Sequence, residues 1–381
     1  MILDQDYRTL EAVSNSSMKV FRKEGPKAYF DNFIDPLRVK EREKSTESTD
    51  VGDLVDCLIT QAAAFDKFYY ISGGVKVSAD EKAILDGVWH EVLSSLTLAR
   101  EAGGAGLEME KALASPMLQD ISLVGLAIIR HARVLDMGDG KIGYRSNYGD
   151  EALAAHFVKK CAAYYSDLGA ANGRKVLDQT TFNTAVAAKN ALLEDSLTGP
   201  LFVVNDLDEH IELKMQLMVT APVNGVLCKI LLDYVLFDHK NKTIWPKDVK
   251  TAFSHEQFRI NYRKYDYANQ GSFYSGILKI VYPTYTVMPF EFIVCTTNSG
   301  EAPMIYKMTS TELTIAKNGA VLKSGTTISG WMNLVEEIAW HLSTSNWIWP
   351  KDYYDNGFIL LNSYSNEAID GEFSDMEDDI F

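Results

Sequence analysis

The stretch that decides the fold is VLCKILLDYVLFDHKNKTIWPKDVK, residues 226–250. It holds two β-rich runs, Val226–Phe237 and Thr243–Lys250, on either side of a short polar turn. If these runs pair as an antiparallel hairpin, residues whose numbers sum to about 481 face each other. This register places Asp233 opposite Asp248. The sequence therefore predicts two carboxylates, from neighbouring strands, on one face of a sheet.

A second turn, Ala221–Gly225, precedes the hairpin and predicts a third strand. We expect pairing around this turn to bring Glu212 near Asp233. Because strand side chains alternate between faces, Lys250 points to the same side as Asp248. Carboxylate oxygens suit Mg²⁺ or Mn²⁺, and a lysine beside them can orient a nucleophile or stabilise a charged transition state. The pattern therefore predicts a three-stranded meander carrying a divalent-metal hydrolytic site.

The plainer interpretation is that Asp233 and Asp248 face solvent and that Lys250 pairs with one of them. The neighbours of Asp233 in the sequence argue against solvent exposure. Asp233 is preceded by Ile230–Leu232 and followed by Tyr234–Leu236, a pattern typical of a buried strand. A charge inside such a strand is costly unless it is paired or bound to a metal.

The composition is that of an ordinary soluble protein, with 381 residues, 46% of them hydrophobic and 23% charged. The chain is long enough for one large domain or two smaller ones. It opens without the basic-then-apolar pattern of a signal peptide, and no apolar run is long enough to span a bilayer. Its scattered cysteines favour a reducing compartment and disfavour a local zinc or iron–sulfur cluster; they are Cys57, Cys161, Cys228 and Cys295. We therefore expect a cytoplasmic protein that has no membrane partner.

The net charge of −15 argues against nucleic-acid binding by a global field. The last fifteen residues hold seven of these negative charges and no Lys or Arg, which leaves −8 on the remainder. DNA contacts would then need a local basic track, for which Arg259, Arg263 and Lys264 are the candidates. The alternative is that these three residues form a solvated helix face.

Several segments show helical or strand patterns around the meander. The serines at 14, 16 and 17 precede an apolar pair, Met18 and Phe21, and predict a capped helix that ends at Gly25-Pro26. Further helices are expected at about 49–64, 78–100, 151–168, 180–192, 254–281 and 326–342, and further strands at 289–296 and 304–308. We predict a single domain over residues 1–365, with a helical insertion at about 72–200, and a disordered acidic tail over 366–381.

Gln270 and Tyr274 lie four residues apart and therefore on one face of the helix predicted there. Both are neutral hydrogen-bonding groups that could hold a phosphate or the lysine. The alternative is a polar helix edge with Tyr274 in the core.

The motifs, taken in order, resemble the PD-(D/E)XK nucleases of the RecB-like branch, and most closely the RecE-like exodeoxyribonuclease VIII group of phages and prophages. The resemblance runs, with gaps, from about residue 10 to 350. It rests on Ser14–Phe21 with Pro26 and Tyr29, Gly52–Asp56, Ile211–Leu213, Gly225–Asp233, Asp248–Thr251 and Gln270–Tyr274.

The resemblance implies an α/β (α+β) fold with a restriction-endonuclease-like core. In such a core a central mixed sheet, with an antiparallel meander, is flanked by helices, and a largely helical insertion is added. It also implies a Mg²⁺-dependent exonuclease, with Mn²⁺ as a substitute, that resects double-stranded DNA from the 5′ end for phage-type recombination. A ring-like homo-oligomer, a single-strand-annealing partner and a bacterial host cytoplasm are expected with it.

Family roles transfer to matching positions in this chain. The implied catalytic residues are Glu212, Asp233, Asp248, Lys250, Gln270 and Tyr274. The implied metal ligands are Glu212, Asp233, Asp248, the carbonyl of Val249 and Asp56. Ser16 is also expected to contact DNA, in addition to the basic track of Arg259, Arg263 and Lys264 that the sequence itself indicates.

Two positions depart from the family pattern. Asp56 stands where the family has a histidine, so an oxygen replaces an imidazole as the expected ligand. Gly25 stands where iron–sulfur relatives often have a cysteine, so we expect no iron–sulfur cluster. Residues 100–170 have no assigned counterpart.

The tail, Glu372–Phe381, resembles the acidic, aromatic-ended tip of bacterial single-strand-binding proteins, which dock in a basic pocket of a partner. A purely solubilising tail is the alternative. For the whole chain, the rival functions are an endonuclease on the same core and a non-catalytic DNA-binding or virion-associated protein that retains the fold.

Overall fold

The computed structural model describes residues 7, 9–38, 47–72, 77–101, 121–137, 140–203, 209–297, 301–321 and 327–359. The chain divides into two compact units, which are considered separately. Unit 1 comprises residues 1–44 and 188–381, and unit 2 comprises residues 45–187. Unit 2 therefore starts earlier than the predicted insertion at about 72–200.

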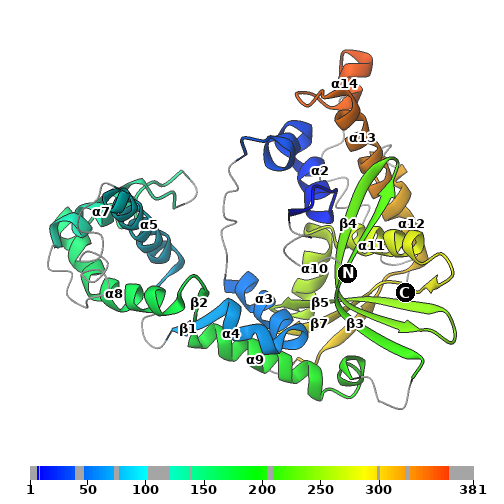
Figure 1. Cartoon of the computed structure of the whole chain (residues 1–381), viewed down its shortest axis with the longest axis horizontal. Coiled ribbons are helices and arrows are strands. Elements are labelled where there is room, and N and C mark those ends of the chain that lie inside the picture. The colour runs from blue at the N-terminus through cyan, green and yellow to red at the C-terminus, as the bar shows by residue number, and fades with distance from the viewer. Residues whose placement is uncertain are drawn as a thin grey trace. The chain divides into compact units, whose positions relative to one another are not determined.

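Unit 1 is built on a mixed sheet whose strands run in the order β3-β4-β5-β7-β8, with β6 also paired to β5. The strands are β3 (Ile211–Val223), β4 (Val226–Asp238), β5 (Thr243–Ala252), β6 (Thr286–Val287), β7 (Glu291–Thr296) and β8 (Met304–Lys307). The β3-β4-β5 meander is antiparallel, β5 runs parallel to β6 and β7, and β8 is antiparallel to β7. The predicted fold class is confirmed, because a central mixed sheet with an antiparallel meander is flanked by helices (Figure 1).

The predicted register of the β4–β5 hairpin is confirmed. Tyr234 pairs with Lys247, a pair whose numbers sum to 481, and the ladder ends there. Asp233 and Asp248 are the next residues of β4 and β5, at the point where the two strands separate. Beyond it, β5 continues by pairing with β7 from Lys247 onwards.

The expectation that Glu212 lies near Asp233 is wrong. Glu212 pairs with Phe237, and Gln216 fills the register position opposite Asp233. The cause is the β3–β4 turn, in which Asn224 and Gly225 both have positive φ, at 49° and 78°. A two-residue turn of this kind fixes the register. It leaves Glu212 four residues along β3 from the expected place, about 13 Å at 3.3 Å per residue.

The alternation of β4 changes between Leu232 and Val235, the stretch that holds Asp233. Cys228, Ile230 and Leu232 pack in the unit 1 core, and so do Val235 and Phe237, which have the opposite parity. On β3, Gln216 occupies the register position opposite Asp233 and has a φ of 50°. The residue pairs on either side of Gln216 are intact. Local breaks in strand regularity of this kind re-aim side chains and are common beside active sites.

The helices of unit 1 cover this sheet and one another. They are α2 (Asn15–Tyr29), α10 (His255–Lys264), α11 (Tyr267–Val281), α12 (Ser310–Asn318), α13 (Trp331–Thr344) and α14 (Lys351–Asn356), with a π-helical turn, η1 (Phe30–Ile34), after α2 and a 3-10 turn, η3 (Gly199–Phe202). Helix α11 packs on β3 and β4, α10 packs on β5 and β7, and α2, α12 and α13 pack against α11 (Figure 1). A serine caps α2, as predicted; it is Ser14, whose side chain forms a capping box with Ser17.

Two predicted helices of unit 1 have different bounds. The helix expected over 254–281 is broken at Asp266, which adopts a left-handed conformation with φ of 61°. The helix expected from residue 326 begins at Trp331, because β10 (Thr327–Ile328) pairs with β9 (Ala320–Val321). The predicted tail, 366–381, lies outside the described residues.

Unit 2 is mainly helical, as expected of the inserted segment, and also holds a two-stranded parallel sheet. Its elements are α3 (Glu47–Thr60), η2 (Ala62–Ala64), α4 (Phe65–Phe68), β1 (Tyr69–Ser72), α5 (Ala79–Glu101), α7 (Ile121–Val134), α8 (Asp150–Ala171), β2 (Lys175–Asp178) and α9 (Gln179–Glu194), the last of which runs into unit 1. Leu85, Ile128 and Phe157 are among its fully buried core residues. Across the described parts of both units, none of the helices has the length and apolar character needed to cross a bilayer.

Candidate functional site

Asp248 is a buried carboxylate at the point where β5 leaves β4. Its side chain is 4% exposed, and its two oxygens have different partners. Gln270 Nε2, from α11, donates a hydrogen bond of 2.9 Å to Oδ1. Lys250 Nζ lies 2.5 Å from Oδ2 as an ion pair. The strand alternation predicted for Asp248 and Lys250 therefore holds.

The electrostatics of Lys250 place Asp233 in the same cluster. Burial acts to lower the pKa of the Lys250 ammonium, but Asp248 and then Asp233 oppose this and raise the pKa above its ordinary value. The ammonium also lies 5.1 Å from the centroid of the Tyr267 ring, at the start of α11. The Lys250 ammonium therefore interacts electrostatically with two carboxylates and lies over one aromatic ring.

Tyr274 joins the cluster one helical turn after Gln270. Burial raises the pKa of its hydroxyl well above 10, the negative charges of Asp248 and Asp233 raise it further, and a hydrogen bond with Gln270 opposes them. The ring also packs against the unit 1 core and has an edge contact with Phe290. The two interpretations of Tyr274 are thus combined, since a core residue presents its hydroxyl to the acidic pair.

The same electrostatic coupling brings in Tyr7, which the sequence did not single out. The buried Tyr7 belongs to an N-terminal segment held against β4, where Lys229 Nζ donates to the carbonyls of Tyr7 and Leu10 at 2.9 and 2.8 Å. The backbone of Val13 bonds to β4 at Leu227 and Lys229. No local pattern around Tyr7 predicts this position, because it depends on pairing across more than two hundred residues.

Glu212, which was expected at this site, is occupied elsewhere. Its Oε2 lies 3.0 Å from His239 Nε2 and 3.3 Å from Lys214 Nζ. His239 Nδ1 in turn lies 2.8 Å from the Tyr285 hydroxyl. Glu212 is thus part of a half-exposed surface network at the turn end of the β4–β5 hairpin, and the geometry removes it from the acidic pair.

Asp56 lies on α3 in unit 2. Its carbonyl accepts a hydrogen bond of 2.8 Å from the Thr60 hydroxyl, whose oxygen is also 3.5 Å from Asp56 Oδ1. Its assignment as a metal ligand stays a prediction.

The basic candidates line one edge of unit 1. Arg259, Arg263 and Lys264 are exposed on α10, and Ser16 is exposed in the first turn of α2. Helix α2 adds two lysines, Lys19 and Lys23, that the sequence reasoning missed. Lys23 Nζ donates to the Lys264 carbonyl at 3.2 Å, and Lys19 Nζ lies 5.0 Å from the Tyr265 ring centroid. Their i,i+4 spacing on one helix face was the available signal.

The carboxylates of the cluster suit a divalent cation that keeps part of its water shell. Among the described residues, no three or more His, Cys, Asp or Glu side chains form a group that could hold a metal. Mg²⁺ does not need such a cage, because it keeps several waters and is usually held by one or two carboxylates together with substrate phosphates. Asp233 and Asp248 meet that requirement, with the Val249 carbonyl as an expected third donor.

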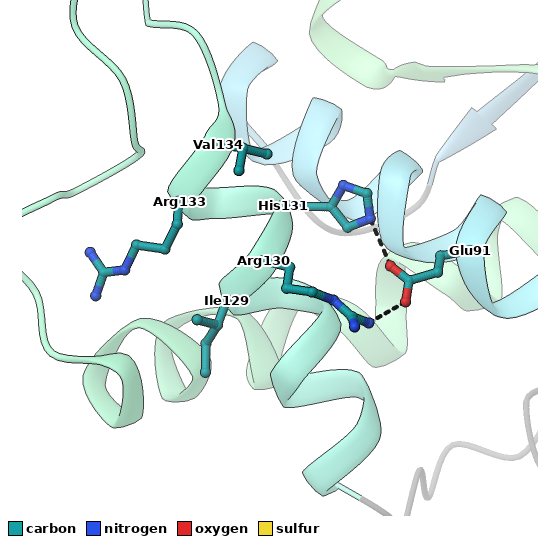
Figure 2. Close-up of a pocket in the computed structure, with 6 residues that line it drawn as sticks. All are labelled: Glu91, Ile129, Arg130, His131, Arg133 and Val134. Atoms are coloured by element: carbon teal, nitrogen blue, oxygen red, sulfur yellow. Dashed lines mark hydrogen bonds and ion pairs between the residues drawn. The ribbon is translucent and has the colours of Figure 1, made fainter.

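A pocket in unit 2 is a separate feature. It has a volume of about 430 Å³ and is lined by Glu91, Ile129, Arg130, His131, Arg133 and Val134. Figure 2 shows Glu91 bridging Arg130 and His131, so these charges satisfy one another. The Arg133 guanidinium points away from that bridge in Figure 2 and pairs with Asp150 at 2.7 Å. The one carboxylate that lines the pocket, Glu91, is therefore already paired with two basic side chains.

Comparison with known proteins adds little to this geometry. No protein-family model matches the chain, and no curated protein matches it. Two chains of solved structures match, and one is the crystal structure of a candidate exonuclease from Eubacterium rectale, at 15% identity. The match covers 59% of this chain and 81% of that one, with a TM-score of 0.30. A likeness this weak carries no argument about activity.

Proposed function

We propose that this protein is a metal-dependent deoxyribonuclease that removes nucleotides from the ends of double-stranded DNA. The observation that carries the proposal is the cluster in which Asp233, Asp248 and Lys250 meet at the parting of β4 and β5, with Gln270 on Asp248. The buried carboxylate of Asp248 and the partly buried one of Asp233 share one cation, and such a group is costly to fold. Such an arrangement is typical of a site that handles a charged substrate.

Each residue has a distinct part in the proposed hydrolysis. Asp233 and Asp248, with the Val249 carbonyl, would hold Mg²⁺ or Mn²⁺, which supplies Lewis-acid polarisation of the phosphate when bound. Gln270 holds Oδ1 of Asp248, so the carboxylate cannot rotate freely and Oδ2 stays directed at Lys250. Lys250 orients the attacking water and offsets negative charge on the phosphate. The Tyr274 hydroxyl, next to Gln270, adds a further hydrogen-bonding group beside the two carboxylates.

The substrate path follows the basic edge formed by α2 and α10. Arg259, Arg263 and Lys264 contact backbone phosphates, and Ser16 adds a hydroxyl donor. This local track explains how a chain with net charge −15 binds DNA. The 5′ polarity, the annealing partner, the homo-oligomer, the docking role of the acidic tip and the phage context are proposals that come from the resemblance alone.

A non-catalytic DNA-binding protein is the second candidate, and one observation favours it. Glu212, the third expected carboxylate, is displaced from the acidic pair and bonded to His239. If the site has lost a ligand that the chemistry requires, the fold and the basic edge remain while hydrolysis does not.

Degradation of end-labelled linear duplex DNA with Mg²⁺ decides between the two candidates. We expect the wild type to release nucleotides, chelation by EDTA to stop it, and Lys250→Ala and Asp233→Asn to lose at least about 10²-fold in rate. Glu212→Gln is the matched control, because it changes a carboxylate outside the cluster. A wild type that binds but degrades nothing supports the binding protein. Cleavage of covalently closed circles supports an endonuclease instead.

A further inference from the structure

Tyr265 is an exposed aromatic ring with two ammonium groups close to it. It lies between α10 and α11 and is 38% exposed. Lys19 Nζ, from α2, is 5.0 Å from its ring centroid, and Lys264 Nζ is 5.5 Å from it. An aromatic ring flanked by cations is the combination that binds single-stranded nucleic acid, because bases stack on the ring and phosphates pair with the cations.

The backbone beside the ring is firmly anchored. Asp266, which follows it, has φ of 61°, an uncommon conformation for a residue other than glycine. It forms an ion pair with Arg22 of α2 and accepts a hydrogen bond of 2.8 Å from Asn269. Lys23 of α2 reaches the carbonyl of Lys264. The neighbours of Tyr265 are thus tied to a second helix, so the ring is presented from a rigid junction.

The ring is also continuous with the candidate site. Its centroid lies 6.0 Å from that of Tyr267, and Tyr267 in turn carries the Lys250 ammonium at 5.1 Å. Two neighbouring rings, with ammonium groups at either end, therefore connect the exposed edge of unit 1 to the acidic pair. A strand whose terminal phosphate lies at Lys250 would pass Tyr265 within its first few nucleotides.

We propose that Tyr265 stacks on an unpaired base of the DNA strand that enters the site, while Lys19 and Lys264 contact its phosphates. A ring can reach the face of a base only where pairing and stacking are interrupted. The preferred substrate is therefore a DNA end with a single-stranded overhang or a frayed terminal pair. Stacking is tolerant of sequence, so no base preference follows. The inference rests on the proposed function only for the placement of the strand.

The test measures binding without cleavage. In a Lys250→Ala background, the probes are a single-stranded oligonucleotide with 2-aminopurine near its end, the same end as an overhang on a duplex, and a blunt duplex. Tyr265→Ala is compared with Tyr265→Phe and with Tyr353→Ala. Tyr353, on α14, is the matched control, because it is an equally exposed tyrosine at 38%. Tyr265→Leu keeps an apolar side chain without a π face, which keeps the test valid if the alanine variant fails to fold.

We expect Tyr265→Ala and Tyr265→Leu to weaken binding of the first two probes about tenfold. They should also abolish the quenching of 2-aminopurine, while Tyr265→Phe and Tyr353→Ala keep both properties. Blunt-duplex binding should change less than twofold. The inference is overturned if Tyr265→Leu binds and quenches as the parent does, or if blunt duplex loses as much affinity as the overhang. Cleavage by a chain with Lys250 intact is scored separately. Ring-dependent binding without cleavage refutes only the nuclease, and cleavage without ring dependence refutes only the stacking.

Discussion

Two carboxylates are buried to the same degree in the two units but are differently surrounded. Glu81 of unit 2 is 4% exposed, and Asp248 of unit 1 is 3% exposed. Glu81 is saturated with donors: Lys160 and His156 each at 2.7 Å, Tyr144 at 3.1 Å and the Ser78 backbone at 2.9 Å. Burial acts to raise the pKa of Glu81, but these hydrogen bonds, that of Lys160 first, lower it to about 2.

Among the described residues, Asp248 accepts a hydrogen bond from Gln270 and pairs with Lys250, a cation that it shares with a second acid, Asp233. A saturated carboxylate stabilises the fold that surrounds it. A buried carboxylate that has few hydrogen-bond donors and lies beside a second carboxylate lowers the stability of the fold. Such arrangements are typical of functional sites. Glu81 and Asp248 therefore differ in the number and kind of their hydrogen-bond donors and not in burial. This difference indicates a structural role for Glu81 and a functional role for Asp248.

The largest expected effect is on activity at Asp248. Asp248→Asn keeps the size of the side chain and an oxygen for Gln270, but removes the charge that a divalent cation needs. We expect degradation of linear duplex to fall about 10³-fold. The free energy of unfolding should change by less than about 1 kcal/mol, because Asp233 still faces Lys250. A variant that is inactive only because its urea midpoint has collapsed would contradict this contrast.

Glu81 should show the opposite behaviour. Glu81→Gln leaves Lys160 without its partner, and we expect unit 2 to lose about 3 kcal/mol of stability. In the wild type, a lowered pKa gives stability that is present above the unfolded value near 4.5 and is lost as the pH falls towards 2. Amide hydrogen exchange in α5 and α8 measures this loss for unit 2 separately. Glu151→Gln, on the exposed surface of α8, is the control. Equal pH dependence in the wild type and Glu81→Gln would refute the assignment.

The sheet was largely predictable because its turns are local. The β4–β5 register follows from counting around one polar turn, and Tyr234 does pair with Lys247. The same counting around Asn224-Gly225 would have paired Glu212 with Phe237. The prediction counted around the whole span Ala221–Gly225 instead, which placed Glu212 near Asp233, and the two-residue turn is the better guide to the register.

What the sequence could not supply depends on tertiary contacts. Helix periodicity runs through residues 254–281, yet the chain breaks at Asp266 because Arg22, 244 positions earlier, holds it there. The change of alternation between Leu232 and Val235 likewise arises from packing of both halves of β4 in one core. Neither the helix break nor the change of strand alternation has a local sequence pattern, because each depends on contacts with residues distant in the sequence.

Gln270 is expected to have a smaller effect than Asp248, because it acts through that carboxylate. Gln270→Ala frees Asp248 Oδ1 and allows the side chain to rotate. We expect a 10- to 100-fold loss of activity, as is typical when a partner that orients a ligand is removed. The Mg²⁺ concentration for half-maximal rate should rise with it. Gln257→Ala on α10, whose side chain bonds to Asn261, is the matched control. Loss of rate with an unchanged Mg²⁺ requirement would place Gln270 on the substrate instead.

The smallest expected effect is at Glu212, and it tests the register directly. Its partners His239 and Lys214 form a network that is 35–44% exposed. Glu212→Gln should therefore cost less than about 1 kcal/mol in stability and leave the rate within about threefold. Gln216→Ala changes the residue opposite Asp233 and should reduce the rate more than Glu212→Gln does. If Glu212→Gln is as inactive as Asp248→Asn, the third ligand must be restored in a rearranged hairpin, because the present pairing keeps Glu212 four residues from the position opposite Asp233.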